Sequence, residues 1–328
     1  MTLPESASAA RSRILLGFAA VYLLWGSTYL AIRFAVATLP PLLMAGTRHL
    51  IAGLILYFLM RRLGSVPRPQ PVHWRSALLL GGLFLLGGNG LVSWAEQSVP
   101  SGITALIVAV VPLWMVLLNA ANERLRPRLT VLIGLALGVV GIGLLVLPSF
   151  TGAPGHGSAV GICVLLAATF SWAVGSLYAH QAPLPSSVLL GTAMEMLTGG
   201  VLCWIAGLSI GEGASLHLGV FTFRSLLSLA YLIVFGSLAG FSAYVWLLKV
   251  STPARVSTYA FVNPVIAVLL GWLFAGEALS LRIMLAGTVI VAAVSLILYF
   301  GASHAPPQTV QPPDTERPAV VTSEKRAA

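Results

Sequence analysis

Aromatic and hydroxyl side chains recur on one face of the first long apolar stretch. Tyr22, Trp25, Tyr29 and Arg33 follow one another at helical positions i, i+3, i+7 and i+11. Aromatic faces bind apolar rings and cations, and hydroxyl groups orient a ligand through hydrogen bonds. These groups are costly against lipid, so we expect the face to point into a helix bundle and line a ligand cavity. The alternative is an interface belt with ordinary packing, which applies most to Tyr22.

A similar stripe lies 147 positions later, at Thr169, Trp172, Ser176 and His180. Two copies of one helix with the same polar and aromatic face indicate that both face the interior. Trp172 and Ser176 are therefore cavity candidates beside those of the first stretch.

Other apolar stretches contain polar or aromatic residues that qualify by the same argument. Asn89 is flanked by three glycines, which allow a close approach of backbone or ligand. Asn263 is either an interhelical hydrogen-bonding group or a ligand contact, and the residues leave both readings open. The further cavity candidates are Asn89, Trp94, Tyr244, Tyr259 and Asn263.

Ionisable residues are rare inside the apolar stretches, where a charge is expensive and indicates a function. They are Arg48, His49 and Glu195, with Glu96 near the end of its stretch. Glu195 is the candidate for a proton-coupling carboxylate, and a protonated structural glutamate is the alternative. Arg48 either attracts a substrate carboxylate or extends along its helix to the interface. Arg48 and Glu195 lie about 12 Å apart along the membrane normal, for a core about 30 Å thick, so we expect no direct salt bridge.

Four residues are structural candidates. Glu123 and Glu277 sit where helices end, and we expect each carboxylate to bond to the N-terminus of the next span. Pro112 and Pro264 lie inside apolar stretches, where proline removes a backbone donor.

The elements that must position these residues are membrane-spanning helices. Of 328 residues, 58% are hydrophobic and 8% are charged, whereas soluble domains carry about 25% charged residues. This composition excludes a soluble enzyme and a disordered chain and predicts an all-α integral membrane protein. Ten spans of about 20 residues are expected. They are 14–34, 42–60, 76–95, 101–121, 129–148, 158–178, 187–208, 224–247, 254–275 and 281–300.

The basic residues predict the orientation. With the N-terminus in the cytoplasm, 14 of the 18 Lys and Arg residues fall on the inner side. Residues 1–13 and the proline-rich tail 301–328 are then cytoplasmic, and the tail is expected to be disordered. The net charge of +9 follows from this asymmetry, so we expect no nucleic-acid partner.

The two halves of the chain resemble each other. Trp25 and Trp172 are 147 positions apart, and Trp94 to Pro112 spans the same 18 positions as Trp246 to Pro264. We therefore expect a first repeat at 14–148 and a second at 158–300. Units of five helices begin on opposite sides of the membrane, so the repeats are predicted to be inverted, as in secondary transporters.

The residues also resemble a known family, the EamA family of the drug/metabolite transporter superfamily. The resemblance covers about residues 14–300. It is carried by the segment from Leu24 to Arg33, the segment from Pro40 to Arg48, and the Pro-to-Glu spacings that end at Glu123 and Glu277. The first segment is most similar to a subgroup of inner-membrane exporters. The resemblance implies ten helices and export of a small metabolite or drug, without naming the substrate. The sequence departs from the expected pattern between the sixth and seventh spans, where a basic cluster is missing.

Other classes of protein lack their signatures here. There is no GxxxxGK[ST] motif of a pump and no HExxH motif of a metalloenzyme. The two cysteines show no metal-ligand spacing, so we expect no metal and no cofactor. A secondary transporter that exports amino acids or drugs is the main hypothesis, with proton coupling as an addition, and a channel or uniporter is the alternative. We expect the lipid bilayer and a small-molecule substrate as partners and a working monomer, with a homodimer as the alternative.

Overall fold

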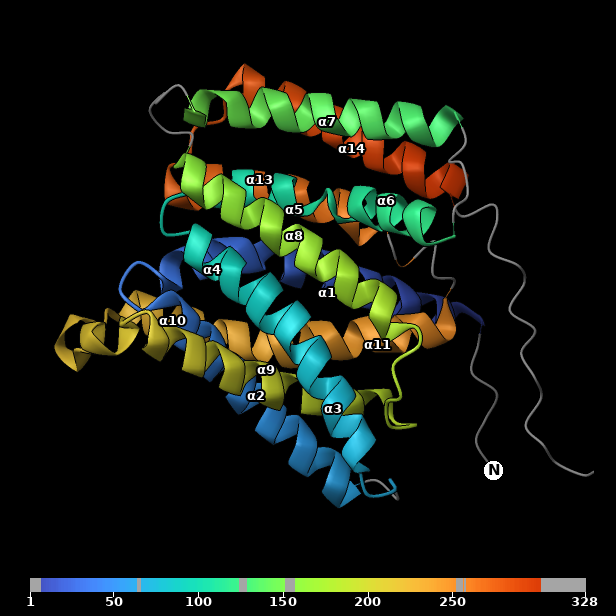
Figure 1. Ribbon diagram of the computed structural model, residues 1–328, viewed down its shortest axis with the longest axis vertical. Helices are drawn as coiled ribbons and strands as arrows, with labels where there is room; N and C mark the ends of the chain where they lie inside the picture. Colours follow the sequence, from blue (N-terminus) through green and yellow to red (C-terminus); the bar gives the residue numbers. More distant parts are fainter. Residues whose placement is uncertain are drawn as a thin grey trace, which may run out of the picture.

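In the computed structural model, the chain forms layers of long helices that run roughly side by side (Figure 1). The structure describes residues 7–63, 66–123, 129–150, 157–251, 256 and 258–301, and no strand occurs within these ranges. Residues 302–328 of the predicted tail and residues 1–6 of the predicted N-terminal segment lie outside the described residues, while residues 7–13 already belong to the first helix.

Each half of the chain contributes its helices in sequence order. Those of the first half are α1 Ala7–Ala35, α2 Pro41–Leu63, α3 Pro71–Leu80, η1 Gly81–Gly90, α4 Leu91–Ala95, α5 Ser101–Val108, α6 Val111–Glu123 and α7 Leu129–Phe150. Those of the second half are α8 Ala159–Ala179, α9 Val188–Ser209, the short 3-10 helices η2 Glu212–Ser215 and η3 Leu218–Val220, α10 Phe223–Tyr231, η4 Leu232–Ala239, α11 Gly240–Val250, α13 Tyr259–Ala275 and α14 Leu281–Gly301.

Among the described residues, eight helical stretches are long and apolar enough to cross a membrane. They correspond to the first eight predicted spans. The last two predicted spans appear as shorter apolar helices, Tyr259–Ala275 and Leu281–Ile297. The all-helical class is thus confirmed, while the number of ten spans stays a prediction.

Three stretches depart from regular α-helix, which the sequence analysis did not foresee. The third and eighth stretches pass through π-helical segments, η1 and η4, and such segments occur often at functional sites. The fourth stretch breaks between α5 and α6. Pro112 has no N–H to donate to the carbonyl of Val108, and the N–H of Val110 bonds to Ile107 O at 3.1 Å.

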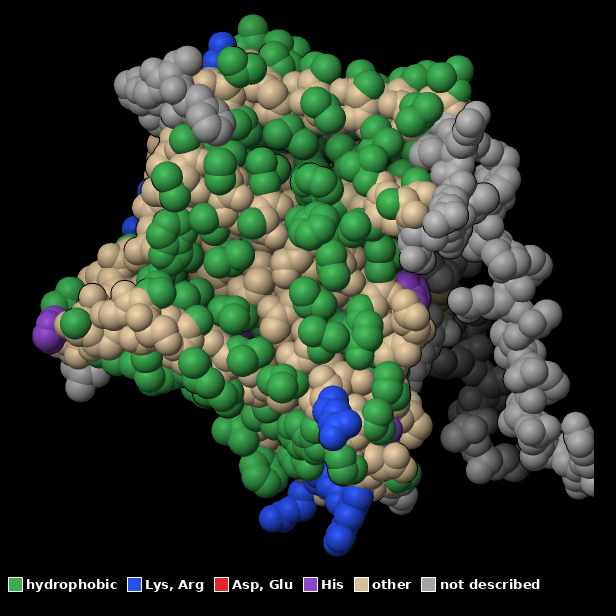
Figure 2. Space-filling model, in the orientation of Figure 1, with side chains coloured by type: hydrophobic (Ala, Val, Ile, Leu, Met, Phe, Trp, Pro, Cys, Tyr) green, Lys and Arg blue, Asp and Glu red, His purple; other side chains and the backbone are tan. Residues whose placement is uncertain are grey.

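The two ends of the bundle differ in charge. We call the end where α1, α4, α9 and α13 finish the carboxylate end, because Glu96, Glu212 and Glu277 lie there. The opposite end, where α1 begins, is the N-terminal end (Figure 1). Basic side chains gather where α2 meets α3 at the N-terminal end, while the surface along the helices is largely hydrophobic (Figure 2). Large apolar side chains such as Leu16, Val139 and Leu147 are exposed on this surface, as a lipid-facing surface requires.

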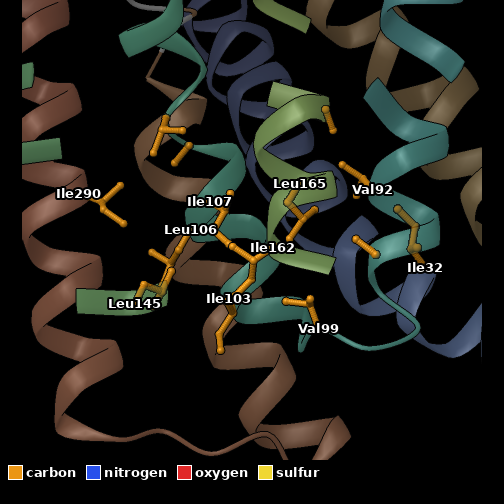
Figure 3. Close-up of a cluster of buried hydrophobic side chains, with 14 of the residues drawn as sticks. Ile32, Val92, Val99, Ile103, Leu106, Ile107, Leu145, Ile162, Leu165 and Ile290 are labelled. Carbon is orange, nitrogen blue, oxygen red and sulfur yellow. The ribbon is translucent and has the colours of Figure 1, made fainter. Parts of the chain in front are cut away.

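The main apolar core lies toward the carboxylate end. It joins side chains from α1, α4, α5, α7, α8 and α14 (Figure 3). Ile103 and Ile107 of α5 and Leu165 of α8 are at most 1% exposed. This cluster fills the space between the two halves of the chain at that end.

Candidate functional site

Trp25 is the centre of a cluster of aromatic rings. Its ring lies 5.1 Å from Tyr244, 5.2 Å from Tyr259 and 6.3 Å from Phe241, measured between centroids. Tyr259 meets both Trp25 and Tyr244 edge-on, an arrangement that aromatic quadrupoles favour. The structure therefore brings together Trp25, Tyr244 and Tyr259, which the sequence placed on three different spans. Phe241 completes the cluster.

Two glycines let α1 approach η4 and α11 closely. The indole N–H of Trp25 donates to Gly236 O at 3.2 Å. A Cβ at Gly240 would lie 2.7 Å from the indole nitrogen, and a Cβ at Gly236 would lie 2.9 Å from the guanidinium of Arg48. The spacing Gly-x-x-x-Gly thus serves close packing here.

Asn263 joins α13 to α1 through hydrogen bonds of its side-chain amide. It is 6% exposed. With its amide nitrogen turned toward them, it donates to the backbone carbonyls of Tyr22 and Tyr259 at 3.2 and 3.3 Å. Tyr22 also shares a hydrogen bond with Thr258 through their hydroxyl groups. Both residues therefore have interhelical partners, which favours the structural reading of Asn263.

Trp172 has a smaller aromatic environment. Its ring lies 4.9 Å from Phe84, and a Cβ at Gly88 would lie 2.7 Å from the Trp172 ring. The hydroxyl of Ser176 donates to the carbonyl of Trp172 at 2.8 Å, within its own helix. Trp172 and Trp25 therefore belong to separate clusters, and Phe84 was not recognised from the sequence.

Asn89 and Trp94 follow in η1 and α4. Both are partly buried. The carbonyl of Asn89 accepts from the Ser93 hydroxyl at 2.8 Å, and that of Trp94 accepts from the Gln97 side chain at 3.0 Å. No ring contact of Trp94 is found among the described residues, so the structure does not join it to either aromatic cluster.

Arg48 turns into the protein between α2 and η4. Its side chain is 6% exposed, and its Nε donates to Ser237 Oγ at 2.8 Å. It does not extend along α2 to the interface. Its neighbour His49 is 2% exposed, and neither ring nitrogen has a hydrogen-bond partner in the described part of the chain.

Glu195 lies on α9 against the start of η1. It is partly buried, and its backbone carbonyl would lie 2.8 Å from a Cβ at Gly81. Its carbonyl also accepts from the Thr198 hydroxyl at 3.1 Å. No salt bridge joins Glu195 to Arg48 within the described ranges, in line with the expected separation.

Two carboxylates cap helix N-termini at the carboxylate end. Glu277 accepts from Ser101 N at 2.6 Å, from Ser101 Oγ at 2.8 Å and from Gly102 N at 2.9 Å. It thus caps α5, whereas the sequence analysis expected the next span, α14. The first N–H groups of a helix carry partial positive charge and have no partner within the helix, so a carboxylate from a distant loop satisfies them.

Glu212 has the same role on α2. Its two oxygens accept from Leu42 N at 3.1 Å and Leu43 N at 2.9 Å. Sequence reasoning missed this residue, because a glutamate in a short loop gives no signal for the helix that it reaches.

The remaining structural candidates have mixed outcomes. Pro112 starts α6 just after the break in the fourth stretch, whereas Pro264 lies inside α13 without ending it. Glu123 ends α6, and its side chain lies outside the described residues.

Glu96 is fully buried just after α4. It has no exposed surface, and neither carboxylate oxygen has a hydrogen-bond partner among the described residues. Burial raises the pKa of the Glu96 carboxyl well above its ordinary value of 4.5, the charge of Glu277 raises this pKa further, and Arg33 lowers it. The Arg33 guanidinium donates to the backbone carbonyl of Glu96.

A groove of about 240 Å³ lies between α1 and α10, beside the cluster around Trp25 rather than within it. Ser27, Phe34 and Tyr231 are among its lining residues, and the hydroxyl groups of Ser27 and Tyr231 share a hydrogen bond of 2.6 Å.

The two tryptophans occupy matching positions in the two halves. Gly88 and Gly240 are 152 positions apart, as are Pro112 and Pro264. Trp25 of the first half packs on Gly240, and Trp172 of the second half packs on Gly88. Each tryptophan therefore meets the glycine of the opposite half.

Comparison with known proteins agrees with this duplication. Residues 12–147 and 159–299 each match the EamA-like transporter family. A protein of Escherichia coli K12 called "Uncharacterized inner membrane transporter YedA" is 41% identical over 280 residues, which cover 85% of this chain and 88% of that protein. A "Probable amino-acid metabolite efflux pump" of Salmonella typhimurium LT2 is 28% identical over 293 residues, which cover 86% and 93% of the two chains.

A solved structure, described only as a crystal structure of a protein, has the same fold. It superposes with a TM-score of 0.57 at 22% identity and covers 89% of this chain and 98% of its own. The apolar helices and the duplicated sequence together define a multi-pass membrane protein of the transporter class. The chain belongs to the EamA-like transporter family, which confirms the resemblance seen in the sequence.

Proposed function

We propose that this protein is a secondary transporter that exports a small metabolite or drug across the inner membrane by alternating access. The observation that carries the proposal is the cluster of Trp25, Phe241, Tyr244 and Tyr259, which α1 of the first half and α11 and α13 of the second half build together. Stacked rings at the meeting point of two repeats suit an apolar or aromatic ligand or a lipophilic cation.

The sealed carboxylate end supports a carrier over a channel. The buried core at that end and the two glutamate caps leave the halves packed together there. With the N-terminus in the cytoplasm, the carboxylate end faces outward, so the described state is closed toward the outside. A carrier needs such a closed state in its cycle.

Arg48 and Glu195 remain candidates for charge recognition and proton coupling. Each borders the π-helical segment of the other half, since Arg48 contacts η4 and Glu195 contacts η1. A substrate that carries both charges, such as an amino acid, fits this pair of opposite groups. We propose Glu195 as a coupling carboxylate, and a transport rate that is insensitive to pH and unchanged in Glu195→Gln would exclude it.

The test is a ligand panel on the purified protein followed by transport. Amino acids, nucleosides and lipophilic cationic drugs are screened for a thermal shift, since a ligand at about 100 times its Kd stabilises by roughly 2.7 kcal/mol. Ligands that shift the protein are then loaded into proteoliposomes, and their efflux is measured. Trp25→Ala should abolish the shift and slow the efflux, with Trp246→Ala as the matched control outside the cluster. No ligand shift and no flux of any panel member would contradict the proposal.

A further inference from the structure

The carboxylate end contains one acid that no other group satisfies. Glu96 has no exposed surface and two oxygens without partners in the described part of the chain. The two other acids at this end, Glu212 and Glu277, both accept backbone hydrogen bonds at helix N-termini. Glu96 therefore differs from them in that no described group donates a hydrogen bond to its carboxylate.

The neighbours of Glu96 are already engaged elsewhere. Arg33 donates to the backbone carbonyl of Glu96 rather than to its carboxylate. Glu277 accepts hydrogen bonds from the first N–H groups of α5 and is engaged there. An ionised Glu96 would thus be buried without a hydrogen bond and beside a like charge, which costs several kcal/mol.

Only a few titratable groups act on Glu96 from the elements around it. They are Tyr29 and Arg33 of α1 and Glu277 of the loop between α13 and α14. On α2, which also packs on α4, Arg48 acts on His49 and not on Glu96. On α8 and η1, which pack on α4 as well, no described group acts on Glu96.

An electrostatic coupling, rather than a chain of contacts, relates Glu96 to the aromatic cluster through Tyr29. Tyr29 interacts electrostatically with Glu96 and also with Tyr259, whose ring contacts Trp25 and Tyr244. The state of Glu96 is therefore placed to influence the residues that we propose to bind substrate.

We propose that Glu96 is a proton-binding site that holds a proton while the carboxylate end is closed and releases it when that end opens. This inference rests on the proposed alternating-access function. On opening, water reaches the carboxyl group, the proton leaves the carboxylate oxygen for that water, and Arg33 becomes free to pair with the anion. On closing, a proton from the water at that end returns to the same oxygen before the core seals.

The test measures how open the carboxylate end is at different pH values. The full chain is placed in nanodiscs with Cys163→Ser and Cys203→Ala, and Ile32→Cys is added as a probe, because Ile32 is 2% exposed in the core at that end. A second protein carries Ala214→Cys, an exposed position in the loop at the same end. The rate of modification by a charged maleimide at Ile32→Cys is divided by the rate at Ala214→Cys, which cancels the pH dependence of the thiol itself.

We expect this ratio to rise with pH, by at most about tenfold per pH unit for one proton. In Glu96→Gln, which keeps the shape and removes the charge, the ratio should stay low at every pH. A ratio that does not change with pH in the protein with native Glu96 would overturn the inference. A rise that persists in Glu96→Gln, or a ratio that is high at every pH in that variant, would overturn it too.

The outcomes separate this inference from the proposed function. Efflux of a ligand without any pH dependence of the ratio would leave the transporter standing and remove the role of Glu96. A pH-dependent ratio that Glu96→Gln abolishes, without ligand binding or flux, would keep the proton site and remove the proposed export. Circular dichroism of Glu96→Gln verifies its helical fold, and a ratio that does not change with pH in the protein with native Glu96 overturns the inference even if that variant does not fold.

Discussion

Trp25 and Trp172 are equivalent in sequence yet have different surroundings. Each packs on a glycine of the opposite half, at the same distance of 2.7 Å from a Cβ placed there. Beyond that contact the two sites diverge. Trp25 has three aromatic neighbours, whereas Trp172 has Phe84.

The divergence follows from substitutions at matching positions. Around Trp25 the second half contributes aromatic residues, and the first half has a small polar or aliphatic residue in each equivalent place. The pairs, 152 positions apart, are Phe241 and Asn89, Tyr244 and Val92, and Tyr259 and Ile107. Val92 and Ile107 belong to the sealed core at the carboxylate end.

The two halves thus contribute an aromatic set and a mainly aliphatic set of side chains at these positions. Aliphatic side chains interdigitate densely and exclude water, so they suit a seal. Aromatic rings with hydroxyl groups combine apolar area with hydrogen bonding, so they suit a ligand. We propose that the Trp25 cluster binds the substrate and that the aliphatic core containing Val92 and Ile107 closes the carboxylate end, and the following predictions test that division.

The largest effect is expected where the closing side is anchored. Glu277 caps α5, the helix that carries Ile107, through three hydrogen bonds. Glu277→Ala should lower the free energy of unfolding by about 3 kcal/mol, because charged hydrogen bonds contribute about 1.5–3 kcal/mol each and water replaces part of them. SDS titration of the purified protein measures this change. Glu277→Gln keeps one acceptor oxygen and should lose less, and an unchanged midpoint in Glu277→Ala would show that the cap does not hold the closing side.

The second effect concerns ligand binding. Trp25→Ala should weaken the ligand found by thermal shift by about 2 kcal/mol, or roughly thirtyfold in Kd, as for a buried aromatic anchor. Trp172→Ala, its counterpart outside the Trp25 cluster, should change Kd by less than about threefold. Isothermal titration calorimetry gives both values. Equal losses in the two variants would contradict the division into a binding side and a closing side.

The third effect tests the contact that both sides share. Gly88→Ala and Gly240→Ala each place a methyl group 2.7 Å from a tryptophan ring atom. Each substitution should lower the free energy of unfolding by about 1.5 kcal/mol, which is within the usual range for overpacking a well-packed site. The matched control is Gly143→Ala in α7, where a Cβ meets only Leu147 at 4.0 Å. This variant should be neutral or more stable, by up to about 1 kcal/mol from helix propensity, and equal losses in all three would rule out the tryptophan contact as the cause.

The smallest effect is the pH dependence of the closing side. Because the pKa of Glu96 in the folded protein is raised above its ordinary value of 4.5, the folded state binds more protons than the unfolded state above that pH. The contribution of Glu96 to the free energy of unfolding is therefore fully present below about pH 4.5. It is lost as the pH rises through the pKa of Glu96 in the folded protein, with a slope of at most about 1.4 kcal/mol per pH unit. Unfolding at several pH values in the native protein and in Glu96→Gln checks this. The difference between the two should shrink as pH falls, and a constant difference would contradict it.

Much of the architecture could be predicted from residue patterns. The apolar stretches predicted the helices closely, with 187–208 observed as Val188–Ser209 and 158–178 as Ala159–Ala179. Membrane-spanning helices can be located from sequence because a backbone exposed to lipid must satisfy its own hydrogen bonds. The length and hydropathy of a stretch are therefore nearly enough to identify a span. The aromatic face of the first span and the duplication were equally visible, since both are periodic in the sequence.

The candidate site was only partly predictable. Trp25, Tyr244 and Tyr259 were each named as candidates from the sequence, but their meeting in one cluster needed the packing of three helices. Trp94 was named by the same reasoning and lies in neither cluster. A helical stripe shows which side chains share one face of a helix, but it does not show which other helix that face contacts.

The sequence by itself determined the helical class, the apolar surface, the two repeats and the family. Each of these follows from composition or from patterns that recur along the chain, so it can be recognised without knowing how the helices pack. Tertiary structure alone decided that Glu277 caps α5, that Glu212 caps α2, and that the Glu96 carboxylate has no hydrogen-bond partner among the described residues. Those contacts join residues far apart in the chain, and a carboxylate in a loop can satisfy any nearby helix end. Only the packing of the helices determines which end it reaches and which charge is left uncompensated.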